Sequence, residues 1–433
     1  MPGWLRSIPI EDGGVLAAVY VVAAVLVVVL VLPRPGTKGR TRTRIGWTAL
    51  AAGIGAAVGL IAVWQVVDVQ DVFGVAASSV IRAAAAAGGA ALGVAVVNLV
   101  RTRWWRKAVA IVAIPVVLAA SGVMINRDVA YYPTLGDAFG DTGVGSLAFD
   151  ATAGQDRSIA SWRPPADMPD HGTVGTESIP GTVSHWQGRD AWIYLPPAAR
   201  TAHPPRLPVV IAFSGEPGGP SDVFLAGGLQ KPLDAIAAQH RGIAPIVVVP
   251  DQLGSYSSNP MCLDSKLGRV ATYVTVDVRH WILDHLPVAS GRKEWTVAGF
   301  SEGGTCAVQF GTEDPGIFGS FIAVSPELAP FNHSIAYTIK AGFNGSKAAY
   351  EAAKPIDVMH RVGHYPRTRA VYSVGGLDKR YGADAGRLAA VSRKVGMTTS
   401  YRVFPTLAHN WNTGSAGLTW GLQQLESWWR LPA

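Results

Sequence analysis

Residues 295–310 read WTVAGFSEGGTCAVQF, which is an apolar run, a Gly-x-Ser-x-Gly motif and a second apolar run. The first run favours a strand, and residues 305–310 are compatible with a helix. Gly299 and Gly303 permit a turn between them that is tight enough to push the Ser301 Oγ out of a sheet. The pattern therefore predicts a strand–turn–helix unit that presents Ser301 as a nucleophile.

A candidate acid and a candidate base follow Ser301 along the chain. Asp378 comes after a strand-like run and a Gly-Gly pair, a position where catalytic groups of open α/β sheets gather. His409 lies in the loop after the next strand-like run. The order serine, aspartate, histidine is typical of a catalytic triad on such a sheet. In this interpretation His409 accepts the Ser301 proton, while Asp378 orients the imidazole and offsets its positive charge.

A simpler interpretation of these three residues is a surface serine, a turn aspartate and a core histidine. The coincidence of motif, preceding strand and residue order favours the triad. Three other aspartates compete for the acid role: Asp264, Asp357 and Asp384. Asp378 is preferred because it directly follows a strand and a Gly-Gly turn.

The oxyanion hole is expected beside an earlier strand. Residues 207–213 read LPVVIAF and run into the glycine-rich turn SGEPGG at 214–219. Backbone N–H groups must point at the developing oxyanion, and glycines let the chain approach closely. The Glu302 N–H, next to the nucleophile, is one expected donor. The Glu216 N–H is the other, because Pro217 has no N–H to give.

From about residue 172 to residue 429 the chain resembles the esterase D-like branch of the α/β-hydrolases, which includes the secreted mycolyltransferases of mycolic-acid-bearing bacteria. The resemblance implies a serine nucleophile, acyl-ester chemistry and no metal or other cofactor. Many relatives carry His-Gly or Asp-Gly at the oxyanion turn, where this chain has Ser214-Gly215. The matching stretches are Asp190–Pro197, Val247–Asp251, Gly299–Gly304 and His409–Trp411.

Strand-like and helix-like runs alternate through the C-terminal part, residues 172–433. Alternation of this kind predicts a mainly parallel sheet flanked by helices, which is the α/β-hydrolase fold. The strand-like runs are 209–213, 245–249, 295–298, 318–324, 370–374 and 401–404. The helix-like runs are 268–285, 305–311, 346–353, 382–395 and 415–429.

The first 125 residues have a different character. Four apolar stretches are each long enough to cross a hydrocarbon core, which takes about 20 helical residues. Gly55 and Gly59 form a small-xxx-small pair that predicts close packing of the second stretch on a neighbour in the same bundle. We therefore expect a four-helix transmembrane domain at 1–125, an extracytoplasmic linker at 126–171 and a catalytic domain at 172–433. The stretches are Val15–Leu32, Ile45–Val67, Val80–Val100 and Ala108–Ile125.

The distribution of positive charge predicts the orientation of these spans. Nine basic residues and no acid lie between spans one and two and between spans three and four, whereas Asp68 and Asp71 lie between spans two and three. The basic loops belong in the cytoplasm, which places both termini and the catalytic domain outside the plasma membrane. The nine residues are Arg34, Lys38, Arg40, Arg42 and Arg44, then Arg101, Arg103, Arg106 and Lys107.

The same count explains the net charge. Subtracting the nine loop charges from the formal +7 leaves −2 for the rest of the chain. The basic balance therefore reflects membrane topology, in which basic loops meet anionic headgroups, and gives no support for nucleic-acid binding.

The chain has two cysteines, Cys262 and Cys306, which are too few for a metal site. An extracytoplasmic domain permits a disulfide between them, and the alternative is two buried free thiols.

These observations predict a membrane-anchored serine esterase that acts on esters of membrane lipids or envelope glycolipids. An acyltransferase of the mycolyltransferase type is the alternative, because water and an alcohol can attack the same acyl-enzyme. A non-catalytic binding module is a further alternative, which an intact triad disfavours. The sequence does not specify the acyl group, the alcohol or the oligomeric state.

Overall fold

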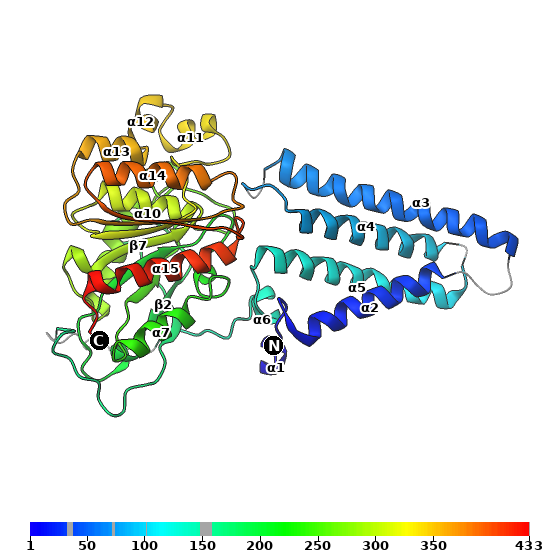
Figure 1. The fold of residues 1–433 in the computed structure, drawn as a ribbon, viewed down its shortest axis with the longest axis horizontal. Helices are drawn as coiled ribbons and strands as arrows, with labels where there is room; N and C mark the ends of the chain where they lie inside the picture. The colour runs from blue at the N-terminus through cyan, green and yellow to red at the C-terminus, as the bar shows by residue number, and fades with distance from the viewer. Residues whose placement is uncertain (33–37, 72–73, 101, 148–157, 433) are drawn as a thin grey trace. The chain divides into compact units, whose positions relative to one another are not determined.

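The computed structural model describes residues 1–32, 38–71, 74–100, 102–147 and 158–432. The chain divides into two compact units, Met1–Gly143 and Val144–Ala433, which are described separately (Figure 1). Arg34 and Arg101, and the side chains of Lys38, Arg40 and Arg42, lie outside the described residues.

Four long helices dominate the first unit, and each is long and apolar enough to cross a membrane. Most of their apolar side chains are not covered by protein, an arrangement that lipid tolerates and water does not. The helices are α2 (Gly13–Val31), α3 (Lys38–Val63) with its π-helical continuation η1 (Trp64–Val69), α4 (Ser79–Leu99) and α5 (Trp104–Val129). The short helices α1 (Gly3–Arg6) and α6 (Leu135–Ala138) complete the unit.

Helices α3 and α4 pack through glycines. A Cβ added to Gly55, Gly59, Gly89 or Gly93 would lie 2.0–2.2 Å from a backbone oxygen of the opposite helix. That distance is far inside van der Waals contact, so only glycine allows the two backbones to approach this closely. The small-xxx-small pair of α3 therefore packs on α4 within the unit.

A polar cluster joins α2, α4 and α5 at one end of the bundle. The Arg106 guanidinium donates to the carbonyls of Leu30 at 2.9 Å and Leu32 at 2.5 Å, at the C-terminus of α2, where carbonyls lack helical partners. Asn98 accepts from Arg106 at 3.2 Å and from Arg44 at 3.0 Å. Arg106, which the sequence predicts in a loop, lies in the first turn of α5 and is buried.

Arg82 has an acidic partner in the same unit. Its guanidinium donates to both carboxylate oxygens of Asp68 at 2.8 Å, so the positive charge near the end of α4 is balanced by a charge on η1. A single nitrogen, Nη2, makes both contacts, so this is one charge-assisted interaction shared between the two carboxylate oxygens.

The glycine contacts predict the effect of substitutions in α3. Gly55→Ala should destabilise the bundle by about 1–3 kcal/mol, because the new methyl group must push α4 away. Gly53→Ala is the matched control, since a Cβ at Gly53 meets nothing within 4 Å. Thermal unfolding of the detergent-solubilised protein measures both, and equal melting temperatures for the two variants would contradict the packing.

The second unit is built on an eight-stranded sheet with the order β1-β2-β4-β3-β7-β8-β9-β10. The pairs from β4 to β10 are parallel, whereas β1 and β2 form an antiparallel edge. The strands are β1 (Thr173–Glu177), β2 (Ala191–Leu195), β3 (Val209–Phe213), β4 (Ile246–Val249), β7 (Trp295–Phe300), β8 (Ser320–Val324), β9 (Arg369–Gly375) and β10 (Thr398–Phe404). A separate two-residue hairpin joins β5 (Asp264–Ser265) and β6 (Gly268–Arg269).

Helices cover both faces of the sheet, so the central strands β2, β3, β4, β7 and β8 are buried along their whole length. One face carries α10 (Glu302–Glu313), α13 (Pro355–Val362) and α14 (Gly382–Lys394), and the other carries α7 (Gln230–Gln239) and α15 (Trp411–Trp429) (Figure 1). The helices α11 (Ile335–Gly342) and α12 (Lys347–Ala352) lie between β8 and β9 in the chain. This arrangement confirms the predicted α/β fold.

Two local features differ from the sequence-based expectation. The helix expected over residues 268–285 is interrupted, because α8 (Val270–Thr272) and α9 (Arg279–His285) flank a π-helical turn, η4 (Tyr273–Val278). Strands β1 and β2 were absent from the predicted strand set. They form an antiparallel pair, and no helix lies between them in the chain. The alternation of strand-like and helix-like runs that predicts the other strands is therefore absent here.

Candidate active site

Ser301 occupies a strained turn between β7 and α10. Its backbone angles are φ 59° and ψ −121°, a conformation that non-glycine residues rarely adopt. The Ser301 N–H donates to the Val324 carbonyl at 2.9 Å, and its carbonyl accepts from the Thr305 N–H at 3.0 Å. The neighbouring strand and the helix therefore hold the turn in place, as strained functional positions require.

The two motif glycines are required by close backbone contacts. A Cβ on Gly299 would lie 2.2 Å from the Gly303 carbonyl oxygen. One on Gly303 would lie 2.4 Å from the carbonyl oxygens of both Phe213 and Ser214, at the end of β3. The helix start thus sits directly against β3, and no side chain fits between them.

The structure brings the three candidate triad residues into one hydrogen-bonded chain. His409 Nε2 lies 2.8 Å from Ser301 Oγ, and His409 Nδ1 lies 2.7 Å from Asp378 Oδ2. The three residues follow β7, β9 and β10, which end at the same edge of the parallel sheet. This geometry fits proton transfer from Ser301 to His409, with Asp378 fixing the imidazole.

Asp378 is held as a carboxylate in a closed environment. Its side chain is 1% exposed, and its Oδ1 accepts from the Tyr381 N–H at 3.0 Å. Burial pushes the pKa of Asp378 upward, but the hydrogen bond and positive charge of His409 and the Tyr381 N–H outweigh it, so the net shift is downward. The charged form is therefore available to stabilise an imidazolium.

The Asp378 and His409 loops meet because of a second glycine pair. A Cβ on Gly375 would lie 2.4 Å from the Leu407 carbonyl, and one on Gly376 would lie 2.6 Å from the Pro405 carbonyl. The imidazole of His409 also packs against Phe300 and Tyr381, with ring centroids 4.9 and 4.4 Å apart.

The turn after β3 is fixed by an ion pair between the partly exposed Arg189 and a buried aspartate. Arg189 donates to the Asp251 carboxylate from Nε at 2.7 Å and from Nη2 at 2.8 Å, and Nη2 also reaches the Gly218 carbonyl at 3.0 Å. Asp251 is fully buried; burial raises its pKa, yet the bonds from Arg189 bring the net shift downward. The pair ties the turn at 214–219 to the end of β4.

Glu216 lies in this turn, and Glu302 lies at the start of α10. The Glu216 carboxyl accepts from Asn259 Nδ2 at 2.5 Å, and burial raises its pKa. The first N–H groups of a helix have no helical partner, so the Glu302 N–H is free of the α10 ladder. The backbone N–H groups of these two residues are the oxyanion donors that the sequence predicts.

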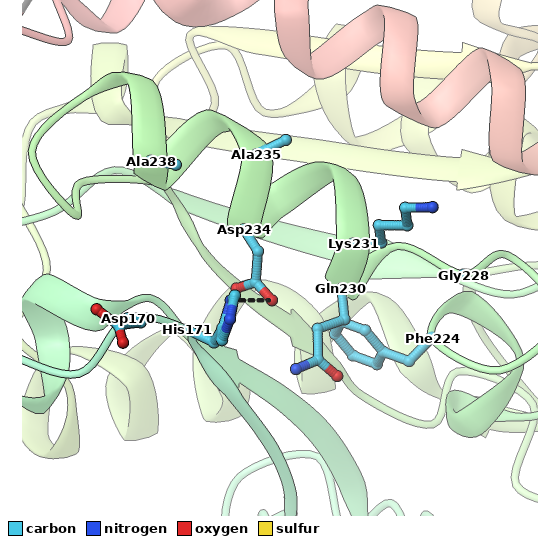
Figure 2. A pocket seen from close by; sticks show the side chains of 9 residues that line it. All are labelled: Asp170, His171, Phe224, Gly228, Gln230, Lys231, Asp234, Ala235 and Ala238. Atoms are coloured by element: carbon cyan, nitrogen blue, oxygen red, sulfur yellow. Dashed lines mark ion pairs between the residues drawn. The ribbon is translucent and has the colours of Figure 1, made fainter. Parts of the chain in front are cut away.

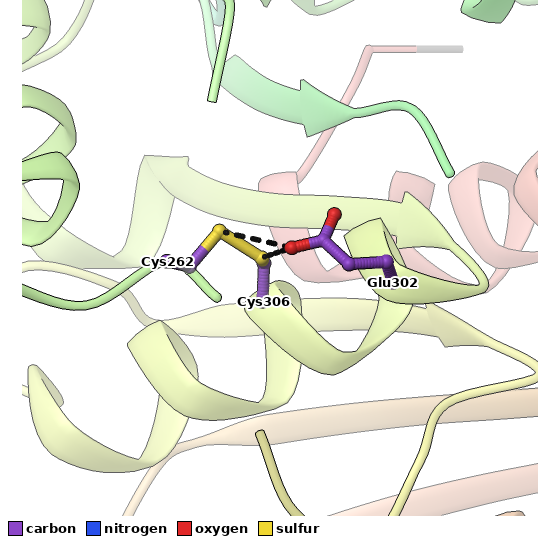
Figure 3. Close-up of side chains that lie close together, drawn as sticks. All are labelled: Cys262, Glu302 and Cys306. Carbon is purple, nitrogen blue, oxygen red and sulfur yellow. Dashed lines mark hydrogen bonds between the residues drawn. A yellow bond between two sulfur atoms is a disulfide. The ribbon is translucent and has the colours of Figure 1, made fainter. Parts of the chain in front are cut away.

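Cys262 and Cys306 form a disulfide with a Cα–Cα distance of 5.6 Å. Glu302 lies beside it, and the three side chains form a buried cluster (Figure 3). Since the sulfur atoms are bonded to one another, neither is a thiolate that could ligate a metal. The disulfide connects the loop after β4 to the helix that follows Ser301.

A separate hollow of about 540 Å³ lies along α7 (Figure 2). None of the three candidate triad residues lines it. Its acidic group, Asp234, already accepts from Tyr194 Oη at 2.8 Å and from the Gly172 N–H at 2.9 Å, and lies 3.9 Å from His171. The hollow is lined by Asp170, His171, Phe224, Gly228, Gln230, Lys231, Asp234, Ala235 and Ala238.

The sequence assigns no supporting role to Arg189, Asp251 or Gln252, although Asp251 ends one of the stretches that resemble the esterase D-like hydrolases. Asp251 follows an apolar strand, which is the same signal that singled out Asp378. Its partner Arg189 is 62 residues away in the chain, however, and no local pattern connects the two.

The disulfide should stabilise the second unit. With a sequence separation of 44, the chain-entropy model gives an upper value of about 4 kcal/mol. Reductant should therefore lower the melting temperature by up to about 10 °C. The control is a Cys262→Ala/Cys306→Ala double variant. Its melting temperature should equal that of the reduced protein and should not change when reductant is added. Two alkylatable thiols in unreduced protein would contradict the bridge.

Comparison with known proteins identifies related sequences. The protein family described as "Putative esterase" matches residues 187–429. An uncharacterized protein of Corynebacterium glutamicum is 30% identical over 295 residues, which cover 66% of this chain and 68% of that protein.

Solved structures share the fold of the second unit. A ferulic acid esterase superposes with a TM-score of 0.50 at 16% identity, over 60% of this chain and 99% of its own. An S-formylglutathione hydrolase from Agrobacterium tumefaciens superposes with a TM-score of 0.50 at 18% identity, over 62% of this chain and 98% of its own. At such low identity the likeness concerns the fold alone.

Proposed function

Since the chain belongs to the esterase family of α/β-hydrolases and is a carboxylic-ester hydrolase, we propose that it is a membrane-anchored serine esterase with its catalytic unit outside the plasma membrane. The observation that carries the proposal is the hydrogen-bonded chain from Ser301 through His409 to Asp378. The proposed substrates are esters of membrane lipids or envelope glycolipids.

In the proposed mechanism the Ser301 Oγ attacks the ester carbonyl carbon while His409 Nε2 takes the serine proton. The carbonyl oxygen becomes an oxyanion, which the N–H groups of Glu302 and Glu216 stabilise. The bond to the alcohol oxygen then breaks, and His409 returns its proton to that oxygen. Water attacks the acyl-enzyme by the same route, which releases the acid and restores Ser301. Asp378 stays ionised throughout and stabilises the imidazolium.

The four apolar helices support a membrane location for this chemistry. An anchor confines the enzyme to the surface that holds a lipid ester, so the effective concentration of substrate is high. The basic residues that lie where α2 joins α3 and where α4 joins α5, several of them in the first turns of α3 and α5, favour a cytoplasmic side for those ends of the helices. The second unit then lies on the opposite side, with esters of the outer leaflet.

The nucleophile can be tested directly. Ser301→Ala should lower kcat for p-nitrophenyl acetate by about 10⁴–10⁶-fold and abolish labelling by a fluorophosphonate probe, because triad members act as a unit. Ser427→Ala, on the exposed face of α15, is the matched control and should keep the wild-type kcat and the labelling by the probe. Persistent labelling of the Ser301 variant would assign the nucleophile to another serine. Detection of free acid, as opposed to a new ester, separates hydrolysis from acyl transfer.

The topology predicts which sites a membrane-impermeant maleimide reaches in intact cells. A cysteine at Asp170 should react, and one at Thr102, between α4 and α5, should react only after permeabilisation. The native cysteines do not interfere, since both are in the disulfide. The opposite pattern would place the catalytic unit in the cytoplasm and remove outer-leaflet esters as substrates.

A further inference from the structure

Glu302 is an acidic side chain buried next to the nucleophile, with 7% of the residue exposed. It sits at the first position of α10, and its carboxyl points along the helix toward the Cys262–Cys306 disulfide (Figure 3). The proposed mechanism uses only its backbone N–H. Among the described residues, no cationic side chain forms an ion pair with this carboxyl. Burying an acid without such a partner is energetically costly, so other contacts must account for its position.

The contacts of the carboxyl assign its proton. Oε1 lies 2.9 Å from the Sγ of Cys306 and 3.7 Å from the Sγ of Cys262. A disulfide sulfur carries no hydrogen, so a hydrogen bond here requires the hydrogen on the carboxyl oxygen. A carboxylate would instead face the sulfur lone pairs with a bare negative charge in a buried site. The geometry therefore fits the neutral acid, with Oε1–H donating to the disulfide.

The second carboxyl oxygen connects Glu302 to the opposite wall of the site. Gln252 Nε2 donates to Glu302 Oε2 at 3.1 Å and to the Ser214 carbonyl at 2.9 Å. Gln252 is fully buried and lies in the loop after β4. Its single NH₂ group thus bridges the start of α10 and the start of the turn that contains Glu216.

These bonds link the two backbone segments on which the proposed oxyanion hole depends. One donor, the Glu302 N–H, belongs to the residue that carries the carboxyl, and the other, the Glu216 N–H, lies two residues after Ser214. An oxyanion donor displaced by a fraction of an ångström loses much of its effect. A fixed spacing between the two segments is therefore a catalytic requirement.

We propose that the Glu302 side chain is a positioning group: as a neutral acid between the disulfide and Gln252, it holds the two oxyanion segments at their catalytic spacing. This inference rests on the proposed esterase function. It assigns the disulfide a second role, as the hydrogen-bond acceptor that keeps the acid protonated and oriented. Neither the side chain nor the sulfurs contact the reacting atoms.

The electrostatics agree with this role. Burial raises the pKa of Glu302 to about 8; the bond from Gln252 opposes the shift, and the nearby carboxyls of Glu216 and Glu327 add to it. Below that pH the acid is neutral and the bond to sulfur is intact. Above it, Oε1 can no longer donate, and a negative charge stands beside the site where the oxyanion must form. Transition-state stabilisation should fall, while substrate binding is largely kept.

The pH dependence of kcat is the first test, with full-length protein in detergent and p-nitrophenyl acetate. For the wild type, kcat should fall by at least about 10-fold between pH 7.5 and 9.5, with KM changed by less than about threefold. For Glu302→Gln, which cannot ionise, kcat at pH 9.5 should stay within about twofold of its own value at pH 7.5.

Glu327→Gln is the matched control for this test. Glu327 is partly buried, and desolvation raises its pKa to about 8, so it could produce the same alkaline loss. The proposal expects the Glu327 variant to keep the loss and the Glu302 variant to abolish it. An alkaline loss that persists in Glu302→Gln, or that disappears in Glu327→Gln instead, would overturn the proposal. Active wild type with inactive Ser301→Ala shows that the esterase function itself holds, whichever result is found.

Gln252→Met provides a second test, since methionine has a similar length and no N–H donors. Its kcat should fall by about 10- to 100-fold with KM within about threefold, because the spacing of the oxyanion segments is no longer fixed. An intact disulfide by mass spectrometry and a sharp thermal transition establish that the variant is folded. A folded variant with wild-type kcat would overturn the link between the two segments.

Discussion

The close approach of the α10 N-terminus to the end of β3 is the constraint on which the site depends. Gly303 lies so near the Phe213 and Ser214 carbonyls that a Cβ would come within 2.4 Å of both. This contact forces the chain to reverse within one residue, and Ser301 takes up that reversal at φ 59°. It also places the Glu302 N–H beside the turn that carries Glu216. This backbone contact therefore positions the serine and the Glu302 N–H, while the Arg189–Asp251 pair holds the turn that carries the other candidate donor.

The parallel sheet places Asp378 and His409 next to Ser301. In the order β3-β7-β8-β9-β10, the ends of neighbouring strands lie about 5 Å apart, so residues far apart in sequence meet at one edge. His409 is 108 residues from Ser301 and 31 from Asp378, yet both contacts are within 2.8 Å. The side chains of the Asp378–His409 pair are largely shielded from solvent. Such a pair contributes more to orientation than to stability, because desolvation offsets much of its attraction.

Local patterns predicted much of this arrangement, for physical reasons that particular residues make clear. The runs 209–213, 295–298 and 370–374 were recognisable because strands buried on both faces are continuously apolar. The glycines around Ser301 and Asp378 marked the turns that require close approach. Contacts between distant segments left no such signal: Arg189 with Asp251, and Gln252 with Ser214 and Glu302. The sequence predicts a loop at Arg106, because the role of this residue in capping the carbonyls of α2 depends on helix packing that its own segment does not reveal.

Glu302 shows most clearly what sequence alone leaves open. Glu302 is one of the two unspecified residues of the Gly-x-Ser-x-Gly motif. The motif assigns a role to its backbone N–H and none to its side chain. A methionine or leucine would fill the same buried space without the cost of removing a carboxyl group from water. A polar group that persists in such a place must satisfy its hydrogen bonds, and here the partners are an amide from the loop after β4 and a disulfide between that loop and α10. The covalent bond fixes the distance between those two elements, and the neutral acid extends that rigidity to the turn that contains Glu216. The stability of the fold and the geometry of the proposed oxyanion hole thus depend on the same few atoms.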